Sequence, residues 1–409
     1  MSQDEYVIVG ASLGGAKAAE ALRAEGFGGP VVLIGAEAEL PYERPPLSKE
    51  YLLGTSPREK IYVHPAAWYD EHDVELRLGV TVTGIDRAAH QLTLADGTEQ
   101  RYAKLLLTTG SAPRQLPVPG ADLDGVLYLR TAADSDRIKA ALASAARVAV
   151  VGAGWIGLET AAAARTAGAD VTVVEVAELP LLRVLGPEVA RVFADLHRDH
   201  GVELRFGTGV AEITGTAGRP TGVRLTDGGQ IETDLVIVGV GITPNVQLAV
   251  AAGLQVADGI VVGADLSTDD PAIYAAGDVA SAFHPLIGTH IRVEHWANAL
   301  HQPQAAARAM LGQPVSYDRV PYFYTDQYDL GMEYSGYVAP GGYERVVFRG
   351  DVAGREFIAF WLDAADRVLA GMNVNIWDVT DPVQALVRSA RPVDPDALRD
   401  PAVDLAALA

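Results

Sequence analysis

The sequence predicts an α/β fold with two Rossmann-like nucleotide-binding domains, the first interrupted by the second, and a C-terminal α+β domain. The main observation is an internal repeat: a β-rich run, a glycine turn and an Ala-rich helix occur at residues 6–25 and again at residues 147–167. After the second copy, residues 268–278 suggest a return to the first domain, and aromatic strands begin near residue 319. The length of 409 residues agrees with two or three domains.

Each copy of the repeat has the same order of elements. The first copy is read as a strand, a turn, a helix and a second strand, at residues 6–9, 10–15, 16–24 and 31–34. In the second copy, a strand at residues 147–151 leads through the turn 152–157 into a helix that runs through Arg165, and a second strand follows at 171–174. An acidic residue follows each second strand, Glu37 in one copy and Glu175 in the other. Two separate nucleotide sites are therefore expected.

The segments between and after the copies set the domain boundaries. Residues 74–109 are read as short strands with a hairpin turn at Asp96-Gly97, and Pro113, Pro117 and Pro119 mark a linker. The later elements are a strand at 235–240, a helix that Gly253 ends, strands at 356–362 and 368–374 joined by residues 363–366, and a helix entered through Asp381-Pro382. The predicted domains are residues 1–112 with 246–318, residues 113–245, and residues 319–409.

Composition excludes several classes of protein. With 32 Lys+Arg against 53 Asp+Glu, the formal charge of -21 repels nucleic acid and anionic membranes. Residues 1–6 lack the pattern of a signal peptide, and no apolar run reaches the roughly 18 residues of a membrane span. We therefore expect a cytoplasmic protein. The absence of cysteine excludes disulfides, thiolate metal sites and a cysteine nucleophile, so redox chemistry would need a bound organic cofactor.

The second glycine turn carries the fingerprint of a dinucleotide site. In Gly152-x-Gly154-x-x-Gly157 the first glycine makes the tight turn, the second admits the pyrophosphate, and the third lets helix and strand pack. Glu175, 23 residues after Gly152, is suited to accept hydrogen bonds from both ribose hydroxyls and to repel a 2′-phosphate. NADH is therefore favoured over NADPH, although Arg183 could soften that preference.

The first glycine turn departs from the pattern, because Ser12 stands where the middle glycine belongs. A small serine could still fit and donate to a phosphate. Gly10-x-Ser12-x-Gly14 also matches the nucleophile elbow of α/β-hydrolases, but only one strand precedes Ser12 where that fold requires several. The acid of this copy is Glu37, with Glu39 or no acid as open alternatives.

Five further motifs resemble one family over residues 6 to about 400. They are PYERPPLSK at 41–49, LTTGSAPR at 107–114, VGVGITPN at 238–245, YAAGD at 274–278 and TDQYDL at 325–330. The chain resembles the putidaredoxin-reductase-like family of oxygenase-coupled, NADH-dependent ferredoxin reductases, within the wider glutathione-reductase-like class of FAD and NAD flavoproteins.

The glycine turns and the resemblance together imply a set of cofactor contacts. On the FAD side these are Gly10, Ser12, Leu13, Gly14, Gly15, Glu37, Arg44, Pro45, Lys49, Val82, Thr109, Gly110, Arg130, Glu159, Gly277, Asp278, Trp296 and Tyr324. On the NADH side they are Gly152, Gly154, Ile156, Gly157, Glu175, Arg183, Gly239, Gly241 and Glu294.

Within this set, some residues have more specific implied roles. Arg44 and Lys49 lie along the flavin, and Asp278 binds the ribityl chain. Gly239, Gly241 and Glu294 border the nicotinamide path, while Trp296 with Asn298 packs near the isoalloxazine ring.

A lysine and a glutamate are implied to act together beside the flavin. The family pairs Lys49 with Glu159, so that the cation steadies negative charge on reduced flavin while the carboxylate holds the lysine. Read without the family, they would be a solvated lysine and a first-turn carboxylate. One departure concerns the aromatic wall: the family often has Trp-Phe-Trp where this chain has Tyr322-Phe323-Tyr324. An aromatic core strand is the alternative interpretation of both tyrosines.

The missing cysteines decide the predicted outlet for electrons. Relatives that reduce disulfides carry a cysteine pair, and those that reduce peroxide or oxygen commonly carry one reactive cysteine. Direct transfer from the flavin edge remains, since FAD accepts a hydride and can release electrons singly. The predicted function is hydride transfer from NADH to FAD, then single-electron transfer to a two-iron two-sulfur ferredoxin serving a haem monooxygenase or ring-hydroxylating dioxygenase.

Several alternatives stay open at this point. They are a rubredoxin reductase or NADH oxidase on the same scaffold, and a non-catalytic NADH-sensing flavoprotein. An acidic ferredoxin would need a local basic patch on this acidic protein. No metal is expected, because His197 and His200 lack a third ligand with suitable spacing.

Overall fold

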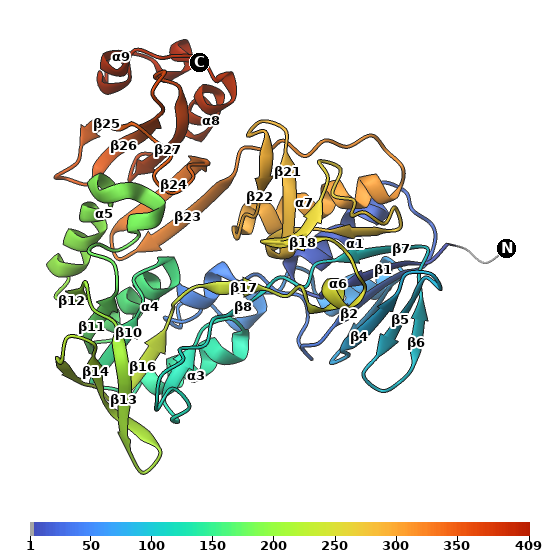
Figure 1. Cartoon of the computed structure of the whole chain (residues 1–409), viewed down its shortest axis with the longest axis horizontal. Coiled ribbons are helices and arrows are strands. Elements are labelled where there is room, and N and C mark those ends of the chain that lie inside the picture. Colours follow the sequence, from blue (N-terminus) through green and yellow to red (C-terminus); the bar gives the residue numbers. More distant parts are fainter. Residues whose placement is uncertain (1–3) are drawn as a thin grey trace. The chain divides into compact units, whose positions relative to one another are not determined.

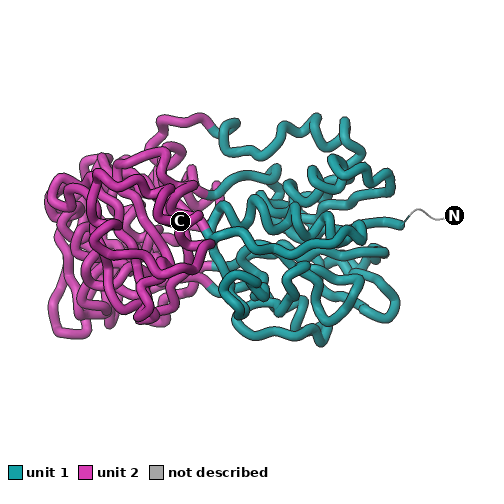
Figure 2. The backbone as a smooth tube through the Cα atoms, turned by 90° about the horizontal axis from the view of Figure 1, so that it is seen from above, with its two compact units in different colours: residues 1–44, 58–112, 243–321 teal, residues 45–57, 113–242, 322–409 magenta. Residues whose placement is uncertain are grey.

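The computed structural model describes residues 4–409 and divides the chain into two compact units (Figure 2). Unit 1 comprises the chain up to Arg44 with residues 58–112 and 243–321, and unit 2 comprises residues 45–57, 113–242 and 322–409. The division into three domains stays a prediction. The expectation that residues 1–6 are no signal peptide falls partly on residues 1–3, outside the described part.

A five-stranded parallel sheet, in the order β20-β7-β1-β2-β3, forms the centre of unit 1 (Figure 1). Its strands are β1 (Tyr6–Val9), β2 (Val31–Gly35), β3 (Val74–Leu78), β7 (Lys104–Leu107) and β20 (Ile273–Ala275). β1 and β2 are buried along their whole length, as expected for strands covered on both faces. The helices α1 (Leu13–Ala24) and α7 (Trp296–Met310) pack against each other.

Smaller elements complete unit 1. They are the antiparallel strands β4 (Val82–Asp86), β5 (Gln91–Leu94) and β6 (Glu99–Arg101), the sheet of β18 (Val256–Ala257), β19 (Gly259–Val262), β21 (Ala280–His284) and β22 (Thr289–Ile291), the helices α2 (Ala66–Glu71) and α6 (Gln247–Ala251), and the 3-10 turns η2 (Arg58–Lys60) and η3 (Gly277–Val279). Asp96-Gly97 forms the turn between β5 and β6, as predicted.

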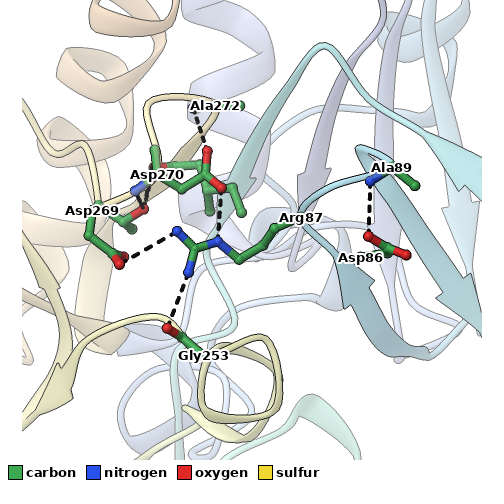
Figure 3. A network of polar contacts seen from close by, with 9 residues as sticks. Asp86, Arg87, Ala89, Gly253, Asp269, Asp270 and Ala272 are labelled. Atoms are coloured by element: carbon green, nitrogen blue, oxygen red, sulfur yellow. Dashed lines mark hydrogen bonds and ion pairs between the residues drawn. The ribbon is translucent and has the colours of Figure 1, made fainter.

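An arginine ties the β4–β5 turn to the segment that enters β20 (Figure 3). Arg87 Nε donates to Asp270 Oδ2 at 2.9 Å, and its terminal nitrogens reach the Gly253 carbonyl oxygen at 3.1 Å and Asp269 Oδ2 at 3.5 Å. The bond to Asp270 is the main reason why the pKa of Arg87 is raised. This network fixes the start of the segment that leads to Gly277 and Asp278.

A second five-stranded parallel sheet, in the order β12-β11-β10-β16-β9, lies in unit 2. Its strands are β9 (Val126–Tyr128), β10 (Arg147–Val151), β11 (Asp170–Glu175), β12 (Glu203–Phe206) and β16 (Leu235–Val238). The accompanying elements are η1 (Pro45–Ser48), α3 (Ala132–Leu142), α4 (Trp155–Thr166), α5 (Leu182–Asp199), and the antiparallel strands β13 (Val210–Thr216), β14 (Arg219–Leu225) and β15 (Gln230–Glu232).

The C-terminal part of unit 2 is an antiparallel sheet in the order β23-β24-β27-β26-β25. Its elements are β23 (Tyr322–Gln327), β24 (Leu330–Gly336), β25 (Arg345–Asp351), β26 (Glu356–Leu362), β27 (Val368–Val374), α8 (Thr380–Ser389), α9 (Pro395–Arg399) and η4 (Leu405–Leu408). This sheet shares a hydrophobic core with α4 and α5. Trp361, fully buried, donates from Nε1 to the Leu185 carbonyl oxygen at 3.0 Å and so anchors α5.

Most predicted elements are present, with shifted ends. β26 and β27 have the predicted bounds. Helix α1 begins at Leu13 rather than residue 16, because Ser12 already has the extended backbone of an N-cap. β16 ends at Val238 rather than residue 240. The short strands β8 (Ser111–Pro113) and β17 (Ile242–Pro244) lie where the chain passes between the units. Among residues 4–409, no helix is long and apolar enough to cross a bilayer.

Candidate functional site

The first glycine turn lies between β1 and α1 of unit 1. Gly10 has φ +122°, and a Cβ there would stand 2.3 Å from the Thr108 carbonyl oxygen, so only glycine fits. Ser12 is the N-cap, and its side chain makes no capping hydrogen bond. Leu13, Gly14 and Gly15 form the first helical turn, whose backbone N–H groups have no partner within the helix. Such a turn suits a phosphate, as predicted for this segment.

Two acidic residues follow β2, and both have partners within unit 1. Glu37 accepts a hydrogen bond from the Tyr42 hydroxyl at 2.5 Å and contacts Arg44 at 3.4 Å. Glu39 instead pairs with Arg58 at 2.5 Å and with the Tyr62 hydroxyl at 2.6 Å. Glu37 thus lies beside Arg44, a second predicted FAD contact, which favours it over Glu39.

Other predicted FAD contacts of unit 1 surround the carboxyl ends of its central strands. Val82 and Thr109 line one hollow of about 450 Å³, together with Asn245. Thr109 Oγ1 donates to the Asn245 carbonyl oxygen at 2.9 Å, and Asn245 Nδ2 donates to the Thr109 carbonyl oxygen at 2.8 Å. Gly110, with φ +62°, follows them. The hollow is therefore lined by apolar side chains and by the hydrogen-bonded pair of Thr109 and Asn245.

The turn η3 and the start of α7 hold the remaining predicted contacts of unit 1. The Gly277 N–H donates to Gln302 Oε1 at 2.7 Å, which fixes the backbone beside Asp278. Trp296 Nε1 donates to Glu43 Oε2 at 3.0 Å. Glu294 pairs with Arg292, yet burial raises the pKa of Glu294 above its usual value.

The second glycine turn lies between β10 and α4 of unit 2. Gly152 has φ +98°, and a Cβ there would stand 2.4 Å from the Gly239 carbonyl oxygen. A Cβ on Gly157 would stand 2.0 Å from the Gly152 carbonyl oxygen, so helix and strand approach closely. Gly154 differs, because no protein atom lies within 4 Å of a Cβ there and its φ is an ordinary -79°. The fold does not require this glycine, whereas a bound pyrophosphate does.

The other predicted NADH contacts border this turn. The large apolar side chain of Ile156 is 42% exposed to solvent. Gly241 has a positive φ of +100°. Glu175 ends β11, and its two carboxylate oxygens accept from the N–H groups of Ala153 at 2.8 Å and Ala177 at 2.9 Å. These bonds hold the carboxylate beside the turn. Arg183 lies in the first turn of α5.

Lys49 and Glu159 form a buried ion pair in unit 2. Lys49 Nζ lies 2.8 Å from Glu159 Oε2, and the side chains are 11% and 4% exposed. Lys49 follows η1, which Pro45 begins, and its Nζ lies 5.7 Å from the centre of the Tyr324 ring. Arg130 follows β9, with its backbone N–H bonded to Asp134 at 3.2 Å. A buried ion pair gains little net stability, because the cost of desolvating both charges offsets their attraction.

Sequence reasoning missed two partners of Glu159. The Ser48 hydroxyl donates to Oε2, and the Thr325 hydroxyl donates to Oε1 at 2.5 Å. Ser48 precedes Lys49 in the motif, so its proximity was a usable signal. Thr325 lies 166 residues from Glu159 and carried no such signal.

The aromatic run and the histidines have distinct surroundings. The Tyr322 hydroxyl donates to Glu333 at 2.7 Å, whereas Phe323 is buried and stacks on Tyr334. His197 is fully buried and bonded to Gln327 at 2.9 Å. No group of three or more metal-ligating side chains occurs between residues 4 and 409.

The chain belongs to the pyridine nucleotide-disulphide oxidoreductase family, whose family model matches residues 4–303; a reductase C-terminal model matches residues 322–409. FAD and NAD(H) are the cofactors of this family, as predicted. The open turn at Gly154 and the two helix starts agree with such ligands.

The chain is similar over its whole length to known ferredoxin reductases. It is 44% identical to the ferredoxin–NAD(+) reductase component of the anthranilate 1,2-dioxygenase system of Burkholderia cepacia, over 99% of both chains. The ferredoxin reductase of the CYP199A2 system of Rhodopseudomonas palustris superposes with a TM-score of 0.95 and 38% identity, covering 99% of this chain and 100% of that one. Putidaredoxin reductase in its covalent complex with putidaredoxin also gives 0.95, with 37% identity and coverages of 99% and 98%. The resemblance and the predicted fold class are thereby confirmed.

Proposed function

We propose that this chain is an NADH-dependent, FAD-containing ferredoxin reductase that supplies a two-iron two-sulfur ferredoxin, and through it an oxygenase. The observation that carries the proposal is the combination of two nucleotide-binding turns with no cysteine anywhere in the sequence. A disulfide cannot receive electrons from the flavin, so they must leave to an external acceptor. Relatives that match 99% of the chain are reductases of this kind.

The chemistry balances with one-electron acceptors. Oxidation of one NADH yields NAD+, one proton and two electrons, and two oxidised ferredoxins take up one electron each. When bound, FAD supplies the step between them, because it accepts a hydride and can release electrons singly. The protein binds and orients both nucleotides and controls the charge around them.

Named residues divide these tasks. The amides of the two turns bind the phosphates, Glu37 and Glu175 accept from ribose hydroxyls, and Asp278 binds the ribityl chain. With FAD bound, Lys49 would lie beside the flavin and would steady the negative charge that reduction places there, while Glu159 holds the lysine. A cytoplasmic location stays a prediction from the sequence.

The test is anaerobic reduction of the purified, FAD-loaded protein with NADH and then NADPH, followed by cytochrome c reduction with and without an added two-iron ferredoxin. Fast bleaching by NADH and ferredoxin-dependent cytochrome reduction support the proposal. Fast bleaching without a ferredoxin effect would contradict it and indicate an oxidase or another acceptor. Slow reoxidation by every carrier would indicate an NADH sensor.

A further inference from the structure

A chain of buried hydrogen bonds in unit 2 ends on the carboxylate of Glu159. Glu159 lies on α4 and is 4% exposed. Its Oε2 atom faces Lys49, while its Oε1 atom accepts from the Thr325 hydroxyl at 2.5 Å. Thr325 itself is 1% exposed. The atom of Glu159 that does not bind the lysine is thus held by β23.

This series of hydrogen bonds continues along β23 and then reaches α5. Thr325 and Gln327 are two residues apart, so they point to the same, buried face of the strand. Gln327 Nε2 donates to Thr325 Oγ1 at 3.3 Å, and Gln327 Oε1 lies 2.9 Å from His197 Nε2. The Tyr328 hydroxyl lies 3.4 Å from His197 Nδ1. The path therefore runs from Tyr328 through His197, Gln327 and Thr325 to Glu159.

Donor and acceptor chemistry gives this path one direction. An ionised carboxylate can only accept hydrogen bonds, so the single hydroxyl hydrogen of Thr325 must be donated to Glu159. The Thr325 oxygen then accepts from the Gln327 amide, whose own oxygen needs a hydrogen on His197 Nε2. His197 Nδ1 is left bare and accepts from Tyr328. In each of these four hydrogen bonds, the donor is the residue farther from Glu159 along the path.

A purely structural role explains this arrangement poorly. Polar side chains that are almost fully buried contribute little net stability, and apolar residues of the same shape would serve as well. A connected network instead fixes one geometry. Burial also lowers the pKa of His197 to about 4, which keeps its ring neutral near pH 7 and in the state that the chain requires.

We propose that Thr325, Gln327 and His197 are positioning residues that hold the Glu159 carboxylate, and through it Lys49, in a fixed place for the flavin. This inference rests on the proposed function, which places Lys49 beside the flavin. Without the Thr325 bond, Glu159 is held only at Oε2, by Ser48 and Lys49, so the carboxylate and its lysine partner are less firmly placed. The lysine then steadies the negative charge on the flavin less well.

The test compares Thr325→Val, which removes the hydroxyl at nearly constant size, with Thr325→Ser, which keeps it. The FAD-loaded proteins are measured for NADH-driven flavin reduction and for the flavin midpoint potential. For Thr325→Val we expect the rate to fall about ten-fold with little change in KM, as for a lost bond to a charged group. The equilibrium constant for flavin reduction should also fall about ten-fold, which lowers the two-electron midpoint potential by about 30 mV. Thr325→Ser should restore both.

Three further measurements separate the possible failures. Ser335→Ala removes another buried hydroxyl of the same sheet, bonded to Gln384, and should leave the potential unchanged. Gln327→Leu should lower the rate less, by about three-fold, because its bond reaches Glu159 only through Thr325. Nitrogen NMR should find the ring proton of His197 on Nε2.

This inference would be overturned if Thr325→Val reduced its flavin at the wild-type rate and with the wild-type potential while Lys49→Met reduced its flavin slowly. The proposed function would then remain intact. A proton on His197 Nδ1 would overturn it as well. If Lys49→Met were itself like the wild type, the role of Lys49 in the proposed function would fail. Should Thr325→Val not fold, Gln327→Leu and the NMR measurement decide the question.

Discussion

Gly35 occupies in the first sheet the register position that Glu175 occupies in the second. The Gly10 N–H donates to the Ile34 carbonyl oxygen and the Gly152 N–H to the Val174 carbonyl oxygen, each at 2.8 Å, and Gly35 and Glu175 follow those carbonyls. A Cβ at residue 35 would stand 2.5 Å from the Cβ of Ala11. The first copy therefore has no room for a side chain there, which explains why its acid comes two residues later.

Gly35→Ala should consequently disturb the first glycine turn. We expect the free energy of unfolding to fall by about 1–3 kcal/mol, because Ala11 must move, and FAD to be released more readily. Thermal unfolding and the fluorescence of released flavin measure both effects. Gly28→Ala is the matched control, since no atom lies within 4 Å of a Cβ there. Equal behaviour of the two variants would refute the argument.

Substitution of two glycines in the second turn should affect different properties, stability at Gly152 and NADH binding at Gly154. Gly152→Ala meets the Gly239 carbonyl oxygen and a positive φ, so it should destabilise the fold by about 2 kcal/mol or more. Gly154→Ala meets nothing in the protein and should leave the unfolding temperature unchanged. It should raise the KM for NADH at least about ten-fold, because the methyl group takes the space of the pyrophosphate. A normal KM in Gly154→Ala would show that the pyrophosphate lies elsewhere.

The carboxylate of Glu175 should govern the choice between NADH and NADPH. In Glu175→Gln the negative charge is gone, and one of the two backbone N–H groups loses its acceptor. We expect kcat/KM to fall about ten-fold with NADH and to rise with NADPH, because a like charge no longer faces the 2′-phosphate. Steady-state kinetics with both coenzymes measure the ratio. The exposed neighbour Glu178→Gln should leave it unchanged, and a similar change there would point to a general field effect.

The glycine turns were predictable because their geometry is local. Gly10 and Gly152 each follow a buried strand, and a tight strand-to-helix turn leaves no other residue type possible. The open alternative between Glu37 and Glu39 could not be resolved in the same way. It depends on Arg44, Arg58 and two tyrosines, whose positions follow from tertiary packing.

The partners of Glu159 show the same limit more sharply. The pairing with Lys49 was available through a family resemblance, but no local pattern connects Glu159 with Thr325 or His197. Thr325 and Gln327 alternate with Tyr324 and Asp326, so the sequence predicts two faces of a strand without indicating which is buried. Only the packing of β23 on α4 decides it.

Arg87 should stabilise unit 1 more than an ordinary surface arginine does. Arg87→Met leaves Asp270, which is 12% exposed, without its cation, and removes the bond to the Gly253 carbonyl oxygen (Figure 3). We expect the free energy of unfolding to fall by about 1–2 kcal/mol in denaturant titrations. Arg77→Met breaks a single pair with the exposed Glu75 and should cost less than about 0.5 kcal/mol. Similar costs for the two variants would mean that the network adds nothing.

His197 should make the stability of the protein depend on pH. Burial, with a smaller contribution from the charge of His200, lowers the pKa of His197 to about 4, although its bond to Gln327 opposes the shift. The unfolded chain binds a proton there below about pH 6.5, whereas the folded chain does so only below about pH 4. The contribution is therefore complete above pH 6.5 and is lost as the pH falls toward 4, by about 3 kcal/mol in all.

His197→Leu removes this titration. The unfolding free energy of the wild type minus that of the variant should therefore be highest at pH 7 and should fall by about 3 kcal/mol toward pH 4. Val192→Ala, a truncation on the same helix that adds no titrating group, should differ from the wild type by a constant amount across this range. Urea titrations at half-unit pH steps measure both differences. A constant difference for His197→Leu would mean that the buried ring accepts a proton as readily as in the unfolded chain, and the neutral state that the hydrogen-bond chain to Glu159 requires would then not be maintained.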